Sequence, residues 1–290
     1  MDPRRRRRGV MAVTITVANE KGGVGKTTTA VNLAAGLALK RGGHSGSAGK
    51  VLLVDMDPQG HALLATAFGQ KPSPGGGDLT NLLLESPPPS ALRLAQRGQH
   101  HPNLFVIPSS HHAMVEAAHL LPTLMANETR LSRALAPAQK EFAFIVIDTP
   151  PTTGHLLVNS LVAADLVIIP VETSYLGVSG LLELQRTIDQ VRIHFRPDLK
   201  IFGYLPTLCE EQRSEAQEIL LELNNRYPGE VLAPIHKASD LAYSHSSHMD
   251  VFTYRPPRHR TPDLISSSSR ATQEYAALVD RVLEQADTRG

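Results

Sequence analysis

Cysteine is nearly absent from this sequence, since Cys209 is the only one in 290 residues. A single cysteine excludes an internal disulfide and is typical of proteins in a reducing compartment, so we expect a cytoplasmic protein. We expect Cys209 to be a small, buried apolar residue. The sequence also lacks an early apolar stretch long enough for the core of a signal peptide, which predicts that no secretory signal is present.

Metal-binding patterns are lacking too, although the sequence contains 13 histidines. The most suggestive are the pairs His100–His101 and His111–His112, and His245 with His248. Two adjacent histidines do not point at one spot, and no cysteine or carboxylate cluster completes a tetrahedral ligand set around them. The sequence therefore disfavours a structural zinc site.

Neither sign of charge is in large excess, since 29 lysines and arginines face 28 aspartates and glutamates. The first ten residues hold five arginines, Arg4 to Arg8, and one aspartate, which leaves 24 basic against 27 acidic side chains elsewhere. We expect residues 1–10 to be a disordered basic tail, either a nucleic-acid arm or a translated leader before a start at Met11. Residues 11–290 are expected to form a single domain, because a chain this long with 41% hydrophobic residues can bury one large core.

Apolar runs predict the sheet. They are Val13–Val17, Val51–Val54, Phe144–Ile147, Leu166–Ile169 and Ile201–Leu205. Because they are continuous runs and do not alternate with polar residues, they indicate parallel strands covered on both faces. Helix-like stretches such as Thr27–Lys40 lie between them. The expected fold is α/β, with a doubly wound, mostly parallel sheet and helices on both faces.

A glycine-rich loop joins the first predicted strand to the first predicted helix. Glycines let backbone N–H groups turn around an anion, and the positive end of the following helix points at the same place. Lys26 can reach the outer phosphates, and the Thr27 hydroxyl can hold Mg²⁺. The sequence therefore predicts a nucleoside triphosphate site, formed by Gly22, Gly23, Val24, Gly25, Lys26, Thr27 and Thr28.

Two predicted strands end in carboxylates. Asp55 and Asp57 follow one of them, and Asp148 follows another. Because the carboxyl ends of parallel strands border the ligand crevice of an open α/β sheet, we expect these acids beside the phosphate loop. Asp55 would either support a Mg²⁺ shell or accept hydrogen bonds from the loop, and both roles stay open. Without the loop, either acid could instead be a helix N-cap.

The loop departs from the usual pattern G-x-x-x-x-G-K-[ST], because Glu20 stands where the first glycine belongs and Lys21 opens the loop. The run Lys-Gly-Gly-Val-Gly-Lys-Thr-Thr resembles the deviant Walker A loop of the ParA/MinD family of ATPases, closest to the ParA-type (Soj-like) partition ATPases. The resemblance extends from about Val13 to about Tyr254, strongest at 21–29, 54–60 and 146–151. It implies a P-loop NTPase fold of the deviant Walker A type.

The resemblance implies roles for individual residues in binding ATP and Mg²⁺. Lys26 would neutralise phosphate charge in its own subunit, and Lys21 would contact the nucleotide of a partner subunit. Asp57 would position the attacking water. Thr27 and Asp148 would hold Mg²⁺, the latter through water.

A further implication is that Pro206 and Thr207 lie near the adenine base. The resemblance also implies a homodimer that forms with ATP and binds nonspecific DNA. A ParB-like or other cargo adaptor would then stimulate an otherwise slow hydrolysis, so that DNA cargo is segregated or positioned. Such a protein is expected in the cytoplasm, associated with the nucleoid.

DNA contacts are expected from local basic patches, because the chain without its first ten residues is slightly acidic. Asp240 stands where such relatives often carry an arginine, which weakens the match at this surface. The candidate DNA-binding residues are Arg213, Lys237, Arg255, Arg258 and Arg260.

Other functions compete with DNA partition. ParA-like ATPases also position protein organelles, and MinD-like ATPases cycle on membranes through a basic amphipathic terminal helix. Here the expected terminal helix, residues 271–285, carries a stripe from Leu278 to Leu283 that could cover the sheet, and acidic residues outnumber basic ones. We therefore expect no membrane partner.

Two alternatives from other classes also stay open. A phosphotransferase would need a polar substrate pocket beside the γ-phosphate, and the sequence shows no distinctive set of residues for one. A nucleotide-dependent adaptor would bind without hydrolysing. The iron–sulfur relatives of this loop family need two cysteines per subunit, and Cys209 supplies only one.

Overall fold

The computed structural model describes residues 11–42, 49–62, 77–174, 180–255 and 269–288. The predicted basic tail and two candidate DNA-binding residues, Arg258 and Arg260, lie outside this part. No helix within the described residues is both long enough and apolar enough to cross a membrane.

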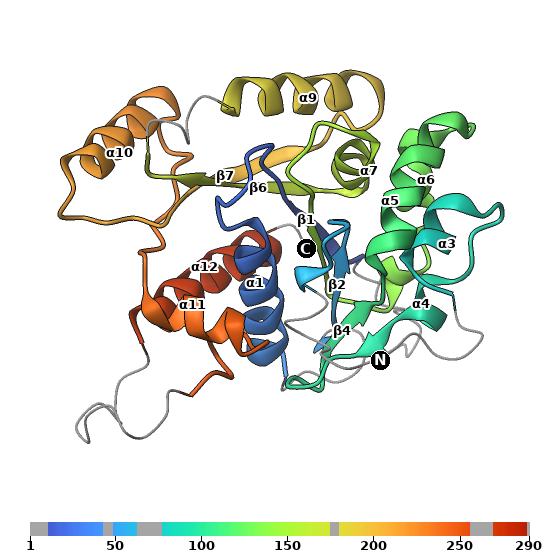
Figure 1. Cartoon of the computed structure of the whole chain (residues 1–290), viewed down its shortest axis with the longest axis horizontal. Coiled ribbons are helices and arrows are strands. Elements are labelled where there is room, and N and C mark those ends of the chain that lie inside the picture. Colours follow the sequence, from blue (N-terminus) through green and yellow to red (C-terminus); the bar gives the residue numbers. More distant parts are fainter. Residues whose placement is uncertain (1–10, 43–48, 63–76, 175–179, 256–268, 289–290) are drawn as a thin grey trace, which may run out of the picture.

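A seven-stranded sheet in the order β3-β4-β2-β5-β1-β6-β7 runs through the described chain (Figure 1). All neighbouring strands pair in parallel except the two-residue edge strand β3, which is antiparallel to β4. This confirms the mostly parallel sheet. The strands are β1 (Val13–Val17), β2 (Val51–Asp55), β3 (Gln96–Arg97), β4 (Leu104–Ile107), β5 (Phe144–Asp148), β6 (Leu166–Glu172) and β7 (Lys200–Thr207).

The sequence predicted five of these strands and missed β3 and β4. Strand β3 has only two residues, both polar, and provides no apolar run, whereas β4 is an apolar run of four residues that was overlooked. The first predicted strand has the same bounds as β1, and the other four end one to three residues too early. In the structure Asp55 and Asp148 are the last residues of β2 and β5, and Glu172 is the last of β6.

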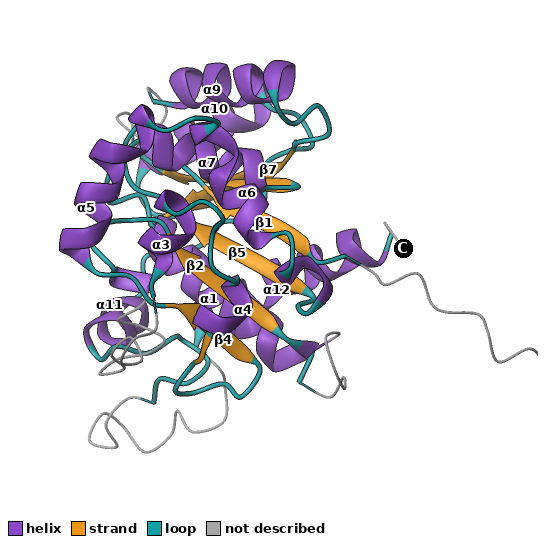
Figure 2. Cartoon of the chain, turned by 90° about the vertical axis from the view of Figure 1, so that its right-hand side faces the viewer, coloured by secondary structure: helices purple, strands orange, loops and turns teal. Residues whose placement is uncertain are grey.

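Helices cover both faces of the sheet, as Figure 2 shows. The longer ones are α1 (Lys26–Lys40), α5 (His111–Leu120), α7 (His155–Ala163), α9 (Leu181–His194), α10 (Ser214–Arg226) and α12 (Arg270–Asp287). The shorter ones are α3 (Leu79–Leu84), α4 (Ala91–Leu94), α6 (Arg130–Leu135) and α11 (Ser239–Ser246). Single 3₁₀ turns stand at Leu121–Thr123, Asn127–Thr129 and Ala138–Lys140.

Successive residues of each central strand pack into different cores. In β2, Val51 and Leu53 join the core under α1 and α12, whereas Leu52 and Val54 join the core under α3 to α7. A third core lies under α7, α9 and α10. Because every residue of β2 is buried on one side or the other, its first four residues are all apolar, and the buried Asp55 at its end is the exception.

The terminal helix α12 lies against α1 (Figure 1). Its buried residues Tyr275, Leu278, Val279 and Val282 share the core with α1. The expected terminal helix is therefore confirmed, but its apolar stripe meets α1, the helix that follows the glycine loop. Ion pairs from Lys40 to Asp280 and from Arg41 to Asp287 fasten the same two helices.

Candidate nucleotide-binding site

The glycine loop leaves β1 and enters α1 without a break. Gly23 and Gly25 have φ angles of 78° and 83°, in the left-handed region that glycine adopts without strain. Gly25 is the residue before α1, and its carbonyl accepts the first bond of the helix from Thr29. The N–H groups of the first helical turn have no partner within the helix, and they favour an anion at this end.

Lys26 is the first residue of α1 and is only 6% exposed. Its Nζ donates a hydrogen bond to the carbonyl of Lys21 at 2.7 Å, so the side chain folds back over the loop. Burial lowers the pKa of Lys26 below its usual value, and the nearby charges of Asp148 and Asp57 oppose this shift. The loop lysine and the two acids predicted for the site therefore lie in one place.

The strand-end acids meet because their strands are neighbours in register. Asp55 pairs with Asp148 across β2 and β5, and Val17 pairs with Asp148 across β1 and β5. The backbone N–H of Asp57 donates to Asp55 Oδ1 at 3.1 Å, and Asp57 Oδ1 accepts from the N–H of Gln59 at 2.9 Å. The Asp57 carboxylate is thereby held at the start of the loop after β2.

Asp148 is fully buried, and neither of its side-chain oxygens has an aligned hydrogen-bond partner among the described residues. Burial and then the charge of Asp55 raise the pKa of Asp148 well above its usual value, while the Thr27 hydroxyl and Lys26 act in the opposite direction. A buried carboxylate without donors is costly unless a cation satisfies it. Oxygen ligands from a carboxylate and a hydroxyl suit Mg²⁺, so this donor set fits the metal.

Thr207 supports the glycine loop directly. Its hydroxyl donates to the carbonyl of Val24 at 2.9 Å, and only 3% of the residue is exposed. Pro206 is buried beside it, and its carbonyl accepts a bond from Ile235. The structure brings both residues to the loop, and their contact with the base stays a prediction.

Lys21 is not a free surface lysine. Its Nζ lies 2.6 Å from Glu172 Oε2, at the end of β6 in the same chain. Its backbone N–H donates to Asn19 Oδ1, and Asn19 Nδ2 donates to the carbonyl of Pro170. Sequence reasoning missed Asn19 and Glu172, although Glu172 carries the signal that identified Asp148, a carboxylate at the end of a buried strand.

Glu20, which replaces the usual first glycine, turns toward α9. Burial raises the pKa of Glu20, and the charge of Glu183 in the first turn of α9 raises it further. This contact was also missed, because the sequence gives no indication that α9 would lie beside the loop.

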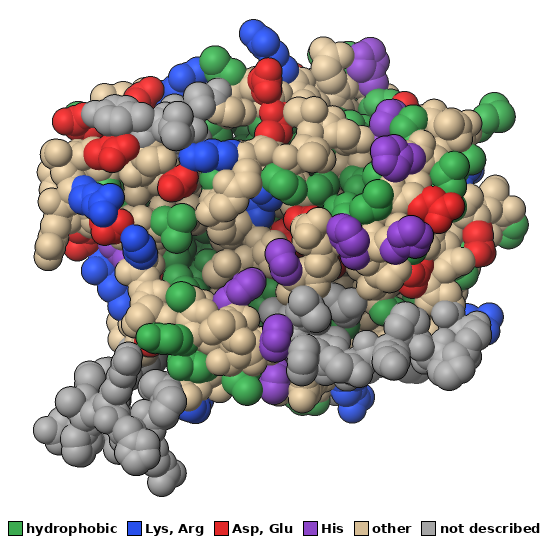
Figure 3. Space-filling view, viewed as in Figure 1, with side chains coloured by type: hydrophobic (Ala, Val, Ile, Leu, Met, Phe, Trp, Pro, Cys, Tyr) green, Lys and Arg blue, Asp and Glu red, His purple; other side chains and the backbone are tan. Residues whose placement is uncertain are grey.

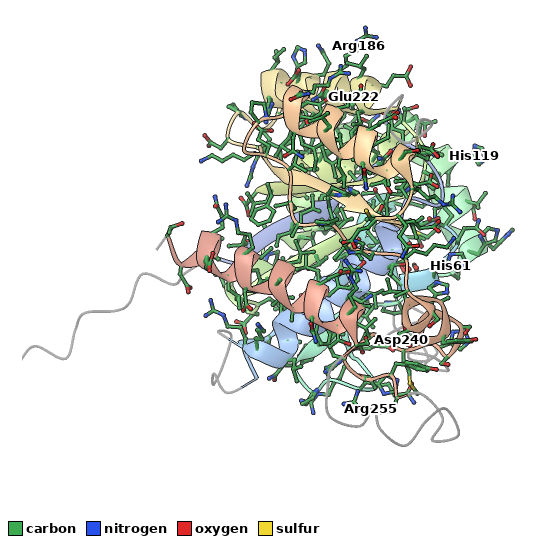
Figure 4. The ribbon with its side chains drawn as sticks, turned by 90° about the vertical axis from the view of Figure 1, so that its left-hand side faces the viewer. His61, His119, Arg186, Glu222, Asp240 and Arg255 are labelled. Atoms are coloured by element: carbon green, nitrogen blue, oxygen red, sulfur yellow. The ribbon has the colours of Figure 1, made fainter. Side chains whose placement is uncertain are left out.

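The described DNA-binding candidates are engaged in contacts within the chain. Arg213 and Lys237 both pair with Glu210, at 3.3 and 3.2 Å. Arg255 donates to nearby carbonyls and lies on the same lower side as Asp240 in Figure 4. In Figure 3, lysines and arginines lie among acidic side chains on the face in view.

Comparison with known proteins identifies the family of this chain. A family model described as an AAA domain matches residues 12–201. The chromosome partitioning protein ParA of Myxococcus xanthus is 37% identical over 227 residues, which cover 76% of this chain and 74% of that protein. This chain belongs to the ParA/MinD family of ATPases. Soj, the sporulation initiation inhibitor protein of Bacillus subtilis, is 34% identical over 221 residues, covering 76% of this chain and 82% of Soj.

Solved structures of similar proteins identify the cofactors. A Mycobacterium smegmatis protein described as cobyrinic acid a,c-diamide synthase, with bound ADP and magnesium, is 29% identical with a TM-score of 0.75. The match covers 97% of each chain. The cofactors of this ParA-family site are ATP and Mg²⁺, in agreement with the buried oxygens of Asp148.

Proposed function

We propose that this protein is a partition ATPase that dimerises with ATP, binds nonspecific DNA as the dimer, and hydrolyses ATP when a partner protein stimulates it. Its cargo is DNA, and it works in the cytoplasm on the nucleoid. The observation that carries the proposal is the second loop lysine, Lys21, which opens the loop although Lys26 already lies near the buried carboxylate of Asp148. One lysine serves the nucleotide of its own subunit, and the second is left for a partner.

The residues have distinct tasks in this proposal. Lys26 binds the phosphates of its own subunit, and Thr27 with Asp148 would hold Mg²⁺, which neutralises phosphate charge. Asp57 positions water, and Lys21 completes the site across the dimer in the manner of an arginine finger. Intrinsic turnover is slow because the second subunit and the partner protein must first complete the site.

Two features support DNA partition over the alternatives. The relatives named above as ParA and Soj match this chain at higher identity than the protein described as a diamide synthase. The apolar face of α12 is buried against α1, so it is not free to enter a bilayer. We therefore place the membrane-cycling function behind DNA partition, with organelle positioning between them.

Binding to a nonspecific DNA duplex with ATP, ADP or no nucleotide tests the proposal. We expect wild type to bind only with ATP, and Lys21→Ala to lose this binding although it still binds nucleotide. DNA binding that is equal with ATP, with ADP and without nucleotide would contradict the proposed dependence on ATP. An ATP-induced dimer without DNA affinity would direct the function to a protein scaffold or a membrane, and flotation with anionic liposomes would separate those two.

Asp57→Ala tests the assignment of the water-positioning residue. The variant is expected to form ATP-dependent dimers like wild type and to release phosphate at a rate at least about a hundredfold lower, since positioned acid–base groups contribute factors of this size. Phosphate release and light scattering on the same samples measure both properties. Normal turnover in this variant would remove Asp57 from the mechanism.

A further inference from the structure

The lysine that would act across the dimer is tied down within its own chain. Lys21 Nζ lies 2.6 Å from Glu172 Oε2, with the side chains 28% and 32% exposed. The Lys21 backbone is attached to the same strand through Asn19, which accepts from Lys21 N at 2.9 Å and donates to the Pro170 carbonyl at 2.7 Å. Both the ammonium and the backbone of Lys21 are thus fastened to β6.

Glu172 is a rigid anchor. It is the last residue of β6 and pairs with Thr207 of β7, whose hydroxyl holds the glycine loop at Val24. Its carbonyl accepts a bond from Ser174, which fixes the backbone on its other side. The backbone of Glu172 is therefore fixed at the C-terminal end of β6, beside the loop.

We propose that Glu172 is a positioning residue that retains Lys21 in its own subunit and must release it before two subunits can close around ATP. The inference rests on the proposed function, in which Lys21 contacts the partner's nucleotide. Two anionic groups then compete for the Lys21 ammonium: the Glu172 carboxylate of its own subunit and the phosphates bound in the other subunit.

Nucleotide binding in the same subunit weakens this retention. Lys26 Nζ donates to the Lys21 carbonyl at 2.7 Å. When Lys26 turns to the phosphates, that bond is lost and the Lys21 backbone is held by Asn19 alone. The Lys21 side chain keeps its contact with Glu172 on a less firmly held backbone, and the partner's phosphates compete with this carboxylate directly.

The expected size of the effect follows from the exposure of the pair. A partly exposed ion pair shifts an equilibrium by about two- to fivefold. Two such pairs must open in each dimer, so the factors multiply. Removing the carboxylate should tighten the ATP-dependent dimer by about four- to twenty-five-fold.

The test measures dimerisation of the full-length protein by sedimentation velocity, with Mg²⁺ and a slowly hydrolysed ATP analogue, with ADP, and without nucleotide. Glu172→Gln should lower the dimer dissociation constant with the ATP analogue by the stated factor. Binding of a fluorescent ADP to the monomer should stay within about twofold of wild type, which also reports that the variant is folded. Glu172→Ala removes the same carboxylate and should shift the dimer in the same direction.

Two further variants make the result specific. Glu222→Gln removes one exposed negative charge from α10 and should leave dimerisation unchanged. Lys21→Ala combined with Glu172→Gln should show no gain over Lys21→Ala alone. A gain that persists without Lys21, or a Glu172→Gln dimer no tighter than wild type, overturns the role of Glu172. Wild type that fails to dimerise with the ATP analogue overturns the proposed function, and the retention of Lys21 with it.

Discussion

At Asp148 the chain keeps a carboxylate from water and from hydrogen-bond donors in the described structure, next to the buried ammonium of Lys26. Each group is expensive to bury, as their opposite pKa shifts show: burial raises the pKa of Asp148 and lowers that of Lys26. These costs are repaid only when a cation reaches the acid and an anion reaches the lysine. At this scale the site is complementary to a metal–phosphate pair.

Lys26→Ala is expected to weaken ATP binding by about a hundredfold or more, because a charge-assisted hydrogen bond contributes up to about 3 kcal/mol. The free energy of unfolding should not fall, since burial already disfavours the charged lysine. Titration with a fluorescent ATP analogue and a urea unfolding curve measure the two properties. Lys40→Ala, at the other end of α1, serves as the control with normal binding. Equal ATP affinity in the two variants would contradict the role of Lys26.

The helix that follows the glycine loop is itself held by α12. Tyr275 of α12 is fully buried, and its hydroxyl lies 3.4 Å from Thr29 Oγ1, one turn after Lys26. Gly36 permits the close approach, because a Cβ there would meet Val279 Cγ2 at 2.6 Å and Phe252 Cε2 at 2.9 Å. By packing against α1, the terminal helix therefore helps to set the position of the nucleotide site at the start of α1.

Gly36→Ala compares two opposing effects in one variant. Alanine gains about 1 kcal/mol of helix propensity over glycine, whereas overpacking a core costs about 1–3 kcal/mol. Since the nearest contact is only 2.6 Å, we expect a net loss of about 1–2 kcal/mol in the free energy of unfolding. Urea unfolding measures it, and adding Val279→Ala should make the combined loss smaller than the sum. Gly180→Ala, where nothing lies within 4 Å, is the control. A stabilised Gly36→Ala protein would refute close packing.

Across the whole molecule, a buried ion pair joins distant parts of the chain. His101, in the loop between β3 and β4, lies 2.9 Å from Asp250, which follows α11. Burial alone would raise the pKa of Asp250, but the hydrogen bond and charge of His101 and the bonds from Thr253 outweigh it, so the pKa lies below its usual value. The pair holds the segment after α11 over α1, where the backbone N–H of Val251 donates to Asn32 Oδ1.

Asp250→Asn should destabilise the protein by about 3–5 kcal/mol at neutral pH, because it leaves a buried pair broken. A carboxylate with a depressed folded pKa contributes stability above its unfolded pKa of about 4, and this contribution is lost as the pH falls through the folded value. The difference from wild type should therefore shrink as the pH falls below about 4. Urea unfolding across this range measures it. Asp189→Asn, an exposed acid, should change little at any pH, and a difference that grows on acidification would contradict the assignment.

Sequence reasoning succeeded where the information was local or carried by long apolar runs. The strand–loop–helix segment from Val13 to Lys40 was predicted almost to the residue, because glycine spacing and continuous apolar runs act over neighbouring positions. Strand β3 was missed because a two-residue polar edge strand carries no apolar pattern, whereas the apolar run of β4 was present in the sequence and was overlooked. The contact of the terminal helix with α1 was not predicted, because an apolar stripe does not say which surface it meets.

The sequence by itself determined the chemistry of this protein: a phosphate-binding loop, two lysines to serve it, and acids at strand ends to hold a metal. These follow from backbone conformation and from neighbouring residues, so they can be read without a fold. The tertiary structure decided which of these groups meet. Lys21 and Glu172 are 151 residues apart and touch only because the sheet places β6 beside β1. Contacts of that kind depend on strand order, which arises from the packing of the whole chain.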